Sequence, residues 1–408
     1  MYPKTILVIE GDPNGPLSPY VGHYINHIQT QGYAPSSVRY HLSLLVYFDA
    51  WLARTGRGLG DIDEALIEKF LTPLVRAKWV HVSAPSTMRR LLTMLRGLGV
   101  TPPAEVVAFT PAQRLTKNYE RFLLEERALS GQTVIAWTPF ISRFLAEKFG
   151  NGPLDLTGLS APDVTSFIQR YARQHGSSYA KKLVTSIRSF LRYLHYKGLT
   201  GDDLAKAVPK VARWSLSTLP KHLSAADVQR VLNACDRRTP LGRRNHAILL
   251  LLARLGLRAG EVLALTLDDL DWENSRMTVR GKGGRSAQMP LPTDVGRAIA
   301  IYVRRDRPRC ESRSVFIRDY APLRGIAGAN SIGKIVQCAL KKAGVTSARK
   351  GAHLLRHSLA TDMLRRGASL DEIGEILRHK SPDTTAIYAK VDVGALRSLA
   401  LAWPGGAQ

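Results

Sequence analysis

The sequence predicts a mainly α-helical protein with a small β-sheet in its C-terminal domain, an α+β arrangement. Apolar residues recur at helical spacing through two long stretches, at about residues 18–100 and 117–199, and a glycine-rich hairpin signature follows at residues 281–284. The chain has 408 residues, of which 45% are hydrophobic. It is therefore long enough for two or three packed domains and too apolar to be a disordered chain.

The first stretch predicts an N-terminal helical domain over residues 1–110. Its apolar residues Val38, Leu42, Leu45, Phe48 and Leu52 recur at the spacing of one helix face. A proline-containing linker is expected at residues 102–111. The sequence does not indicate what this first domain binds.

The second stretch predicts a helical bundle over residues 111–205, with apolar residues such as Val164, Phe167 and Ile168 again at helical spacing. Residues 206–221 then contain prolines, serines and lysines in the proportions of a linker. We expect this bundle to fold as a separate domain.

Residues 222–408 predict a mixed C-terminal domain. Ser224 can cap its first helix, and the segment Asn245–Leu257 is apolar enough to form a buried helix. The segments Arg276–Arg280 and Ala287–Leu291 flank a glycine-rich turn, which is the pattern of a β-hairpin. Further helices are expected at residues 294–305, 331–343, 353–366, 370–377 and 383–388.

The charge of the chain points to a polyanionic partner. There are 58 Lys and Arg against 33 Asp and Glu, a net charge of +25, and both halves of the chain are basic. Nucleic acid is the expected partner. The three cysteines are too few and too scattered for a disulfide framework, and the longest apolar run, Ala247–Ala253, is too short for a membrane span. We expect a soluble intracellular protein.

Several residues could carry chemistry on an anionic substrate. His353 and Arg356 are three apart, so an imidazole and a guanidinium would project from one helix face, a combination suited to phosphate oxygens. Arg258 and Glu261 have the same spacing, and could instead simply close a helix end as an ion pair. Lys282 lies in the hairpin turn, either as a solubilising residue or as a mobile proton donor.

Two more candidates lie near the end of the chain. His379 and Tyr388 are nine residues apart across a turn at Pro382. Taken alone, Tyr388 is equally well interpreted as a packed aromatic residue with its hydroxyl at the surface.

The order and local context of these residues resemble the tyrosine recombinases, the phage integrase family. The resemblance spans about residues 117–393, and depends on an Arg in a GLRxGE-like segment, a hairpin Lys, an HLLRH segment and a Tyr nine residues beyond a His. The matching residues are Arg258, Glu261, Lys282, His353, Arg356, His379 and Tyr388. The additional N-terminal domain is similar to the extensions of transposon and integrative-element recombinases, so the resemblance favours an enzyme of a mobile element.

The resemblance implies a catalytic mechanism without metal, ATP or other cofactor. Tyr388 would attack a DNA phosphodiester and form a 3′-phosphotyrosine with a free 5′-hydroxyl. Arg258 and Arg356 would bind the nonbridging oxygens, and Lys282 would protonate the leaving oxygen. His353 would take part in proton transfer with the tyrosine, and His379 would donate a hydrogen bond to the phosphate. Glu261 would position the Arg258 region.

The resemblance also implies how DNA is held. The domains at 111–205 and 222–408 would clamp a duplex, with basic side chains on its phosphates. The expected DNA contacts are Lys181, Lys182, Arg188, Arg192 and Arg285. Such enzymes recombine as tetramers on two DNA sites, in some cases together with other recombinases. Because the substrate is DNA, we expect the protein in the cytoplasm, associated with the nucleoid. The apolar segment 393–401 would dock either on a neighbouring protomer or on its own domain.

Two positions depart from the family pattern. Arg378 stands where Gly commonly precedes the His, and Lys390 stands where a His commonly occurs after the nucleophile. We expect neither to contact the catalytic set, although both add positive charge near the phosphate.

Three other interpretations remain open at this point. His353, His357 and His379 could form a metal site, but Arg356 between the first two would repel a cation. A noncatalytic DNA-binding protein could keep the fold and the charge, although the catalytic positions are all filled. A type IB topoisomerase would use the same chemistry.

Overall fold

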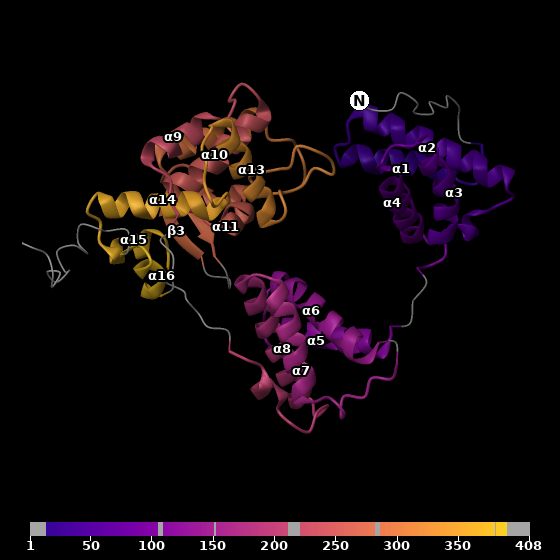
Figure 1. Ribbon diagram of the computed structural model, residues 1–408. Coiled ribbons are helices and arrows are strands. Elements are labelled where there is room, and N and C mark those ends of the chain that lie inside the picture. The colour runs from indigo at the N-terminus through magenta and orange to yellow at the C-terminus, as the bar shows by residue number, and fades with distance from the viewer. Residues whose placement is uncertain are drawn as a thin grey trace, which may run out of the picture. The chain divides into compact units, whose positions relative to one another are not determined.

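The computed structural model describes residues 14–104, 109–150, 152–210, 221–281, 286–379 and 381–389. The chain divides into two compact units, one made of residues 1–103 together with 216–408, and the other of residues 104–215. Figure 1 shows the ribbon of both units, with labels on many of the elements. The mainly helical fold with a small sheet confirms the predicted fold class.

Residues 14–104 form four α-helices around a hydrophobic core of their own. The helices are α1 Ser18–Thr30, α2 Pro35–Arg54, α3 Glu64–Arg76 and α4 Ala84–Gly97, with a short 3-10 turn at Leu59–Asp61. The Asp63 carboxylate caps α3 by accepting from the backbone N–H of Leu66 at 2.7 Å. Phe48 and Phe70, with ring centroids 4.7 Å apart, pack together within the buried cluster.

The second unit is another helical bundle with a separate core. Its helices are α5 Pro111–Glu125, α6 Gly131–Phe149, α7 Ala161–Gln174 and α8 Ser177–Tyr196, followed by a 3-10 turn at Leu204–Ala207. Leu204 and Val208 are buried in the core of this bundle. The chain up to residue 208 is therefore packed on the bundle, although the linker was expected to begin at residue 206.

Residues 221–389 contain, within the described segments, eight α-helices, a 3-10 turn at Leu267–Asp269 and one antiparallel sheet. The helices are α9 Ala225–Asn233, α10 Pro240–Arg254, α11 Ala259–Ala264, α12 Thr293–Arg305, α13 Ala329–Lys342, α14 Ala352–Arg365, α15 Leu370–Ile376 and α16 Pro382–Ala386. The strands are β1 Leu270–Asp271, β2 Arg276–Arg280 and β3 Ser286–Pro290, in the order β1-β2-β3. The register pairs Met277 with Met289 and Val279 with Ala287.

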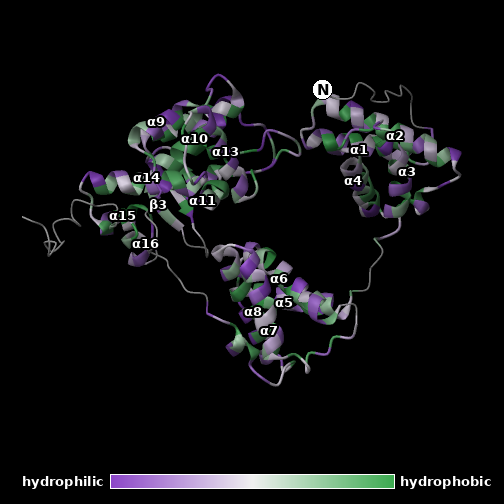
Figure 2. Ribbon diagram, viewed as in Figure 1, coloured by the Kyte–Doolittle hydropathy of each residue, from purple (hydrophilic) through white to green (hydrophobic). Residues whose placement is uncertain are grey.

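The predicted buried helix is α10, which Figure 2 shows as strongly hydrophobic. Residues Ala247–Ala253 of this helix are all buried, so it is covered on every side by the rest of the domain. The helix begins earlier than expected because Thr239 caps it, accepting from the Gly242 N–H at 3.0 Å. It also ends earlier, at Arg254, because Gly256 follows with a φ of +58°.

The ion pair that the sequence suggested for Arg258 is present, but at a different helix end. Arg258 was expected at the end of the buried helix, whereas it precedes α11 as its N-cap residue and pairs there with Glu261. Tyr388 was expected inside a helix, whereas α16 ends at Ala386 and Tyr388 lies in the turn that follows. Within the described part of the chain, no helix combines the length and the hydropathy needed to cross a membrane.

Candidate active site

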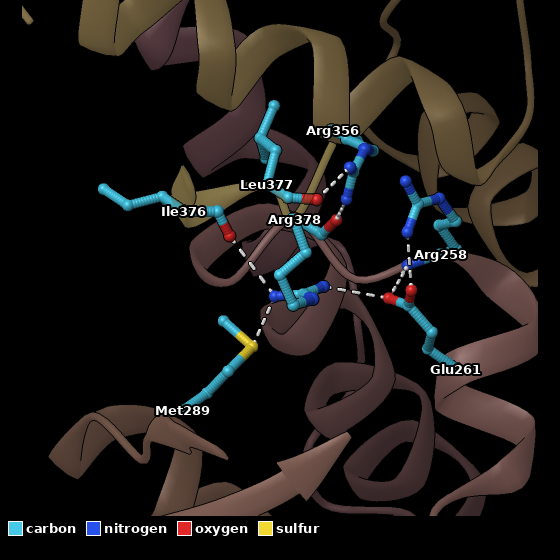
Figure 3. Close-up of polar contacts among 8 residues, drawn as sticks. Arg258, Glu261, Met289, Arg356, Ile376, Leu377 and Arg378 are labelled. Carbon is cyan, nitrogen blue, oxygen red and sulfur yellow. Dashed lines mark hydrogen bonds and ion pairs between the residues drawn. The ribbon is translucent and has the colours of Figure 1, made fainter. Parts of the chain in front are cut away.

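Arg356 is the buried centre of the candidate site. It comes from the first half of α14, and only 3% of the residue is exposed. Its guanidinium donates to the backbone carbonyl oxygens of Gly256 and Leu377, so it joins the segment before α11 to the end of α15 (Figure 3). Burial lowers the pKa of Arg356 to about 10, with the positive charges of Arg258 and Arg378 acting in the same direction. The group is still a cation at neutral pH.

A glycine is required at position 256, where the Arg356 guanidinium contacts the backbone. Its φ of +58° belongs to the left-handed region, and a Cβ at this position would lie 2.6 Å from Leu377 Cδ2 and 3.1 Å from Leu359 Cδ2. The glycine therefore lets α14, the end of α15 and the start of the Arg258 loop approach closely.

Arg258 and Glu261 form a reciprocal pair at the start of α11. The Glu261 carboxylate accepts from the Arg258 backbone N–H at 2.9 Å and from Arg258 Nη1 at 2.7 Å. The side chain of Glu261 is 4% exposed and that of Arg258 is 39% exposed. Burial alone would raise the pKa of Glu261, but the hydrogen bonds from Arg258 and the charges of Arg378 and Arg258 outweigh it and lower the pKa. The carboxylate is thus ionised and the guanidinium remains accessible.

Arg378 also binds Glu261, contrary to the expectation that it would not touch the predicted set. Its Nη2 lies 2.9 Å from Glu261 Oε2, and the side chain further contacts Met289 Sδ and the Ile376 carbonyl. Figure 3 shows the carboxylate held between the guanidinium groups of Arg258 and Arg378. The φ of Arg378 is +54°, a conformation that glycine adopts more easily than arginine.

Tyr388 is buried, with 1% of the residue exposed. Its hydroxyl lies 2.8 Å from Nδ1 of His357, and its backbone N–H donates to the Thr385 carbonyl at 2.9 Å. Burial raises the pKa of Tyr388 to about 12, although the charge of Arg356 opposes that change. The alternative of a hydroxyl at the surface is therefore wrong, because the hydroxyl is enclosed and hydrogen-bonded.

Of the other two predicted histidines, His379 contacts the tyrosine, whereas His353 lies beside His357, with ring centroids 6.2 Å apart. His379 stacks on Tyr388 with ring planes 8° apart and centroids at 6.4 Å, and its Nδ1 lies 2.7 Å from Thr385 Oγ1. Burial lowers the pKa of His379 to about 4, aided by the charges of Arg356 and Arg258. His353 lies at the solvent-facing rim, where partial loss of water and then the charges of Arg356 and Arg258 lower its pKa.

His357 is the residue that sequence reasoning missed as a partner of the tyrosine. It was considered only for a metal site, yet its ring is 5.6 Å from that of Tyr388 in an edge-on arrangement. Burial and the neighbouring charges lower the pKa of His357 to about 4, so the imidazole is neutral near pH 7 and able to accept a proton. The signal available in the sequence was its spacing of four from His353 on the same helix.

The structure brings together five of the six predicted catalytic residues around α14, α15 and the loop before α11. These are Arg258, His353, Arg356, His379 and Tyr388. The predictions for Lys282, Arg285, Lys390 and segment 393–401 fall outside the described residues. Across the part of the chain that is described, no group of three or more His, Cys, Asp or Glu residues is placed to share a metal ion.

The predicted DNA-contact residues of α8 divide into two kinds. Lys181, Lys182 and Arg192 have exposed side chains. Arg188 is half-buried and its Nη2 donates to the carbonyl oxygens of Val208 at 3.1 Å and Pro209 at 3.0 Å. Arg188 therefore holds the end of its own bundle, which the sequence did not suggest.

A helical bundle and a mixed domain with two arginines, histidines and a tyrosine in one cluster define the tyrosine recombinase class of enzymes. The family model described as the phage integrase family matches residues 221–394. The putative integrase/recombinase y4rA of Sinorhizobium fredii is 45% identical over 97% of this chain and 97% of its own length. The tyrosine recombinase XerD of Listeria monocytogenes is 31% identical over 68% of this chain and 94% of its own. The chain belongs to the phage integrase family of tyrosine recombinases.

Solved structures agree with the fold. XerH recombinase in its post-cleavage complex with palindromic difH substrate superposes with a TM-score of 0.54 at 19% identity, covering 70% of this chain and 83% of that one. A lambda integrase dimer bound to a COC′ core site gives a TM-score of 0.51 at 15% identity, covering 67% of this chain and 94% of that one. The protein is a tyrosine site-specific recombinase that functions in DNA recombination.

Proposed function

We propose that this recombinase cleaves and rejoins DNA strands with Tyr388 as the nucleophile, through a 3′-phosphotyrosine and without metal or ATP. The observation that carries the proposal is the short contact between the Tyr388 hydroxyl and Nδ1 of His357, 2.8 Å apart, next to the Arg356 guanidinium. A neutral imidazole beside a phenol is the arrangement expected for general-base activation of a nucleophile.

The chemical step exchanges one phosphodiester for another. The phenolic oxygen of Tyr388 forms a bond to phosphorus, the bond from phosphorus to the 5′-oxygen breaks, and the phenolic proton passes to a histidine, either His357 or His353. Lys282 supplies the proton that the leaving 5′-oxygen requires. Because the energy of the ester is retained, a 5′-hydroxyl can attack the phosphotyrosine and reseal a strand by the same step in reverse.

Positive charge from the protein would stabilise the transition state. Arg356 is held rigidly by two backbone carbonyls, and Arg258 keeps an accessible guanidinium. Guanidiniums suit nonbridging phosphate oxygens because they are planar and permanently charged. Fixed cations aimed at the developing charge typically contribute a large part of such catalysis.

Tyr388 cannot reach a phosphate in the conformation described here. With 1% of the residue exposed and a pKa of about 12, it is shielded and protonated. We infer that α16 and the turn after it shift when DNA binds, which opens a path from the phosphate to the hydroxyl while His357 stays beside it. The short length of α16, five residues, favours such a movement because few packing contacts must be replaced.

The wider assembly follows from the same family assignment. We propose that the helical bundle at 111–205 and the domain at 222–408 hold duplex DNA between them, with Lys181, Lys182 and Arg192 on its phosphates. Four protomers on two DNA sites would carry out the exchange, on the nucleoid. The N-terminal domain at 1–110 and the similarity to a putative integrase/recombinase over the whole chain favour a role in moving a mobile element.

A covalent-capture experiment tests the nucleophile. Wild-type protein and Tyr388→Phe are incubated with nicked duplexes from a randomised library in EDTA, and denaturing gels are searched for a protease-sensitive adduct on a 3′ end. We expect the adduct with wild type alone, and equal DNA affinity for both proteins. An adduct with the Phe variant would show that another residue attacks, and tight binding without any adduct would favour a noncatalytic DNA-binding protein.

A further inference from the structure

We propose that Arg378 is a positioning residue of the active site, which holds and neutralises Glu261 so that Arg258 can bind the DNA phosphate. The inference rests on the proposed function, because it concerns how the phosphate is bound. It assigns a role to a side chain that is not among the residues expected to act on the substrate.

The geometry gives Glu261 two cationic partners from distant parts of the chain. Its Oε1 accepts from Arg258 Nη1 at 2.7 Å, and its Oε2 accepts from the Arg258 backbone N–H and from Arg378 Nη2, both at 2.9 Å. Both carboxylate oxygens are therefore occupied, which fixes the plane of the carboxylate. The Arg258 guanidinium, held by one of its nitrogens, makes no other hydrogen bond to the described residues and has donors left for a ligand.

The charges explain why a second cation matters. Arg258 and Glu261 alone sum to zero, so a phosphodiester would have to compete with Glu261 for the guanidinium. With Arg378 the cluster carries a net charge of +1, and the attraction between Glu261 and Arg258 is shared with another cation. Glu261 is 4% exposed and Arg378 17% exposed, so water screens this interaction only weakly.

Arg378 also connects two other parts of the site. Its Nη1 contacts Met289 Sδ on β3, the strand that follows residues 282–285, and the Ile376 carbonyl at the end of α15. A single side chain thus joins the hairpin, α15 and the start of α11. The residue takes part in these contacts with a φ of +54°, a left-handed conformation that is strained for any residue with a Cβ.

That strained backbone makes the test sharp, because Arg378→Gly removes the side chain and relieves the strain at once. Relief of this strain opposes the loss of the ion pair with Glu261, so the variant should still fold, and its urea midpoint is measured alongside the rate. Cleavage of a suicide duplex, chosen from a randomised library by covalent capture on wild-type protein, should be slowed about tenfold under single-turnover conditions with saturating protein. Arg378→Lys keeps the charge and should recover part of the rate.

Lys78→Gly is the matched control. Lys78 has a φ of +57° and an exposed side chain in the N-terminal unit, so this variant loses the same charge and the same strain away from the site. It should cleave at the wild-type rate. Equal cleavage rates for Arg378→Gly and wild type would overturn the proposal. If Lys78→Gly slowed cleavage as much as Arg378→Gly, the loss of one positive charge would explain the effect, and the positioning role would also be refuted.

A second measurement does not depend on DNA cleavage. The pKa of Glu261, followed by carbon-13 NMR of labelled carboxylates, should rise in Arg378→Gly because one of the charges that lower it is lost. The other groups facing the carboxylate, Arg258, Arg356 and His353, are unchanged in the variant. An unchanged pKa would refute the coupling, whereas a failure of wild type to form any adduct would instead count against the proposed function.

Discussion

The phenolic oxygen of Tyr388 lies 2.8 Å from Nδ1 of His357 in a buried pair that joins the turn after α16 to α14. A tyrosine hydroxyl enclosed in this way needs a hydrogen-bond partner, since a buried polar group without one is costly. The pair thus links the stability of the C-terminal part of the site to the residue proposed as the nucleophile.

Replacing His357 by Phe should destabilise the protein. The ring is retained, but the buried Tyr388 hydroxyl loses its partner, so we expect a fall of about 1–3 kcal/mol in the free energy of unfolding. Urea denaturation of His357→Phe, Tyr388→Phe and the double variant measures the pairing as a coupling energy. Additive effects of the two substitutions would contradict the hydrogen bond.

Acid should destabilise the protein between about pH 6.5 and pH 4. The pKa values of His41, His357 and His379 are each lowered to about 4 by burial first of all, whereas unfolded histidine titrates near 6.5. In that window the unfolded state binds more protons, so stability is full above pH 6.5 and declines as the pH falls through the folded values. Denaturation midpoints at pH 7, 5.5 and 4.5 should decrease in that order, and by less in His357→Phe.

Gly256→Ala should lower the free energy of unfolding more than other substitutions that add a single methyl group. The new Cβ would meet Leu377 Cδ2 at 2.6 Å in a left-handed conformation, so we expect a loss of about 2–4 kcal/mol. Gly198→Ala is the matched comparison, because its φ is +67° and nothing lies within 4 Å of the added carbon. That variant should lose only about 1 kcal/mol in thermal or urea unfolding. Similar losses for both would mean that backbone strain, not crowding, decides the effect.

Glu261→Gln should reduce stability through the arginines it leaves behind. The amide cannot neutralise Arg258 and Arg378, and removing one partner of a buried ion pair costs about 3–5 kcal/mol, of which the amide oxygen recovers part. Glu372→Gln, in an exposed capping box with Ser369, should leave the unfolding midpoint nearly unchanged. Equal stability of the two variants would argue against a buried charge cluster.

Arg188 and Arg192 should behave differently although they lie four residues apart on α8. Arg188→Ala loses two hydrogen bonds to Val208 and Pro209 and should destabilise the bundle by about 1–2 kcal/mol. Arg192→Ala should leave stability unchanged but lower the slope of log affinity against log salt by about 1, as expected for one lost phosphate contact. If Arg188→Ala altered only the salt dependence of DNA binding and not stability, Arg188 would be a phosphate contact and not a support of its own bundle.

The sequence predicted the elements well where periodicity is strong. The core positions of the helical bundles, the buried helix at Ala247–Ala253 and the β-hairpin are found as expected, because each depends on residues close in sequence. The family pattern also selected residues from the start of α11, from α14 and from the segment after α15 that the fold brings together. The bounds near Gly256 and Tyr388 were wrong because a positive φ and a turn ended helices that hydrophobicity alone would continue.

What the sequence could not predict depends on contacts between distant residues. The partner of Tyr388 is 31 positions away and that of Arg378 is 117 positions away, so neither pair has a local spacing that signals it. Arg188 was expected on DNA as one of the basic side chains of the bundle, yet its guanidinium donates to two backbone carbonyls of that bundle. A basic residue with a use inside the fold cannot be distinguished by composition from one that faces a ligand.

The contacts that Arg356 makes inside the domain have a consequence for mutations at this codon. Because its guanidinium binds the carbonyls of Gly256 and Leu377, a substitution that removes it should impair folding, besides the phosphate contact proposed for it. Misfolded chains are removed by cellular proteases. Such a mutation should therefore lower the amount of protein in the cell, and not only its activity.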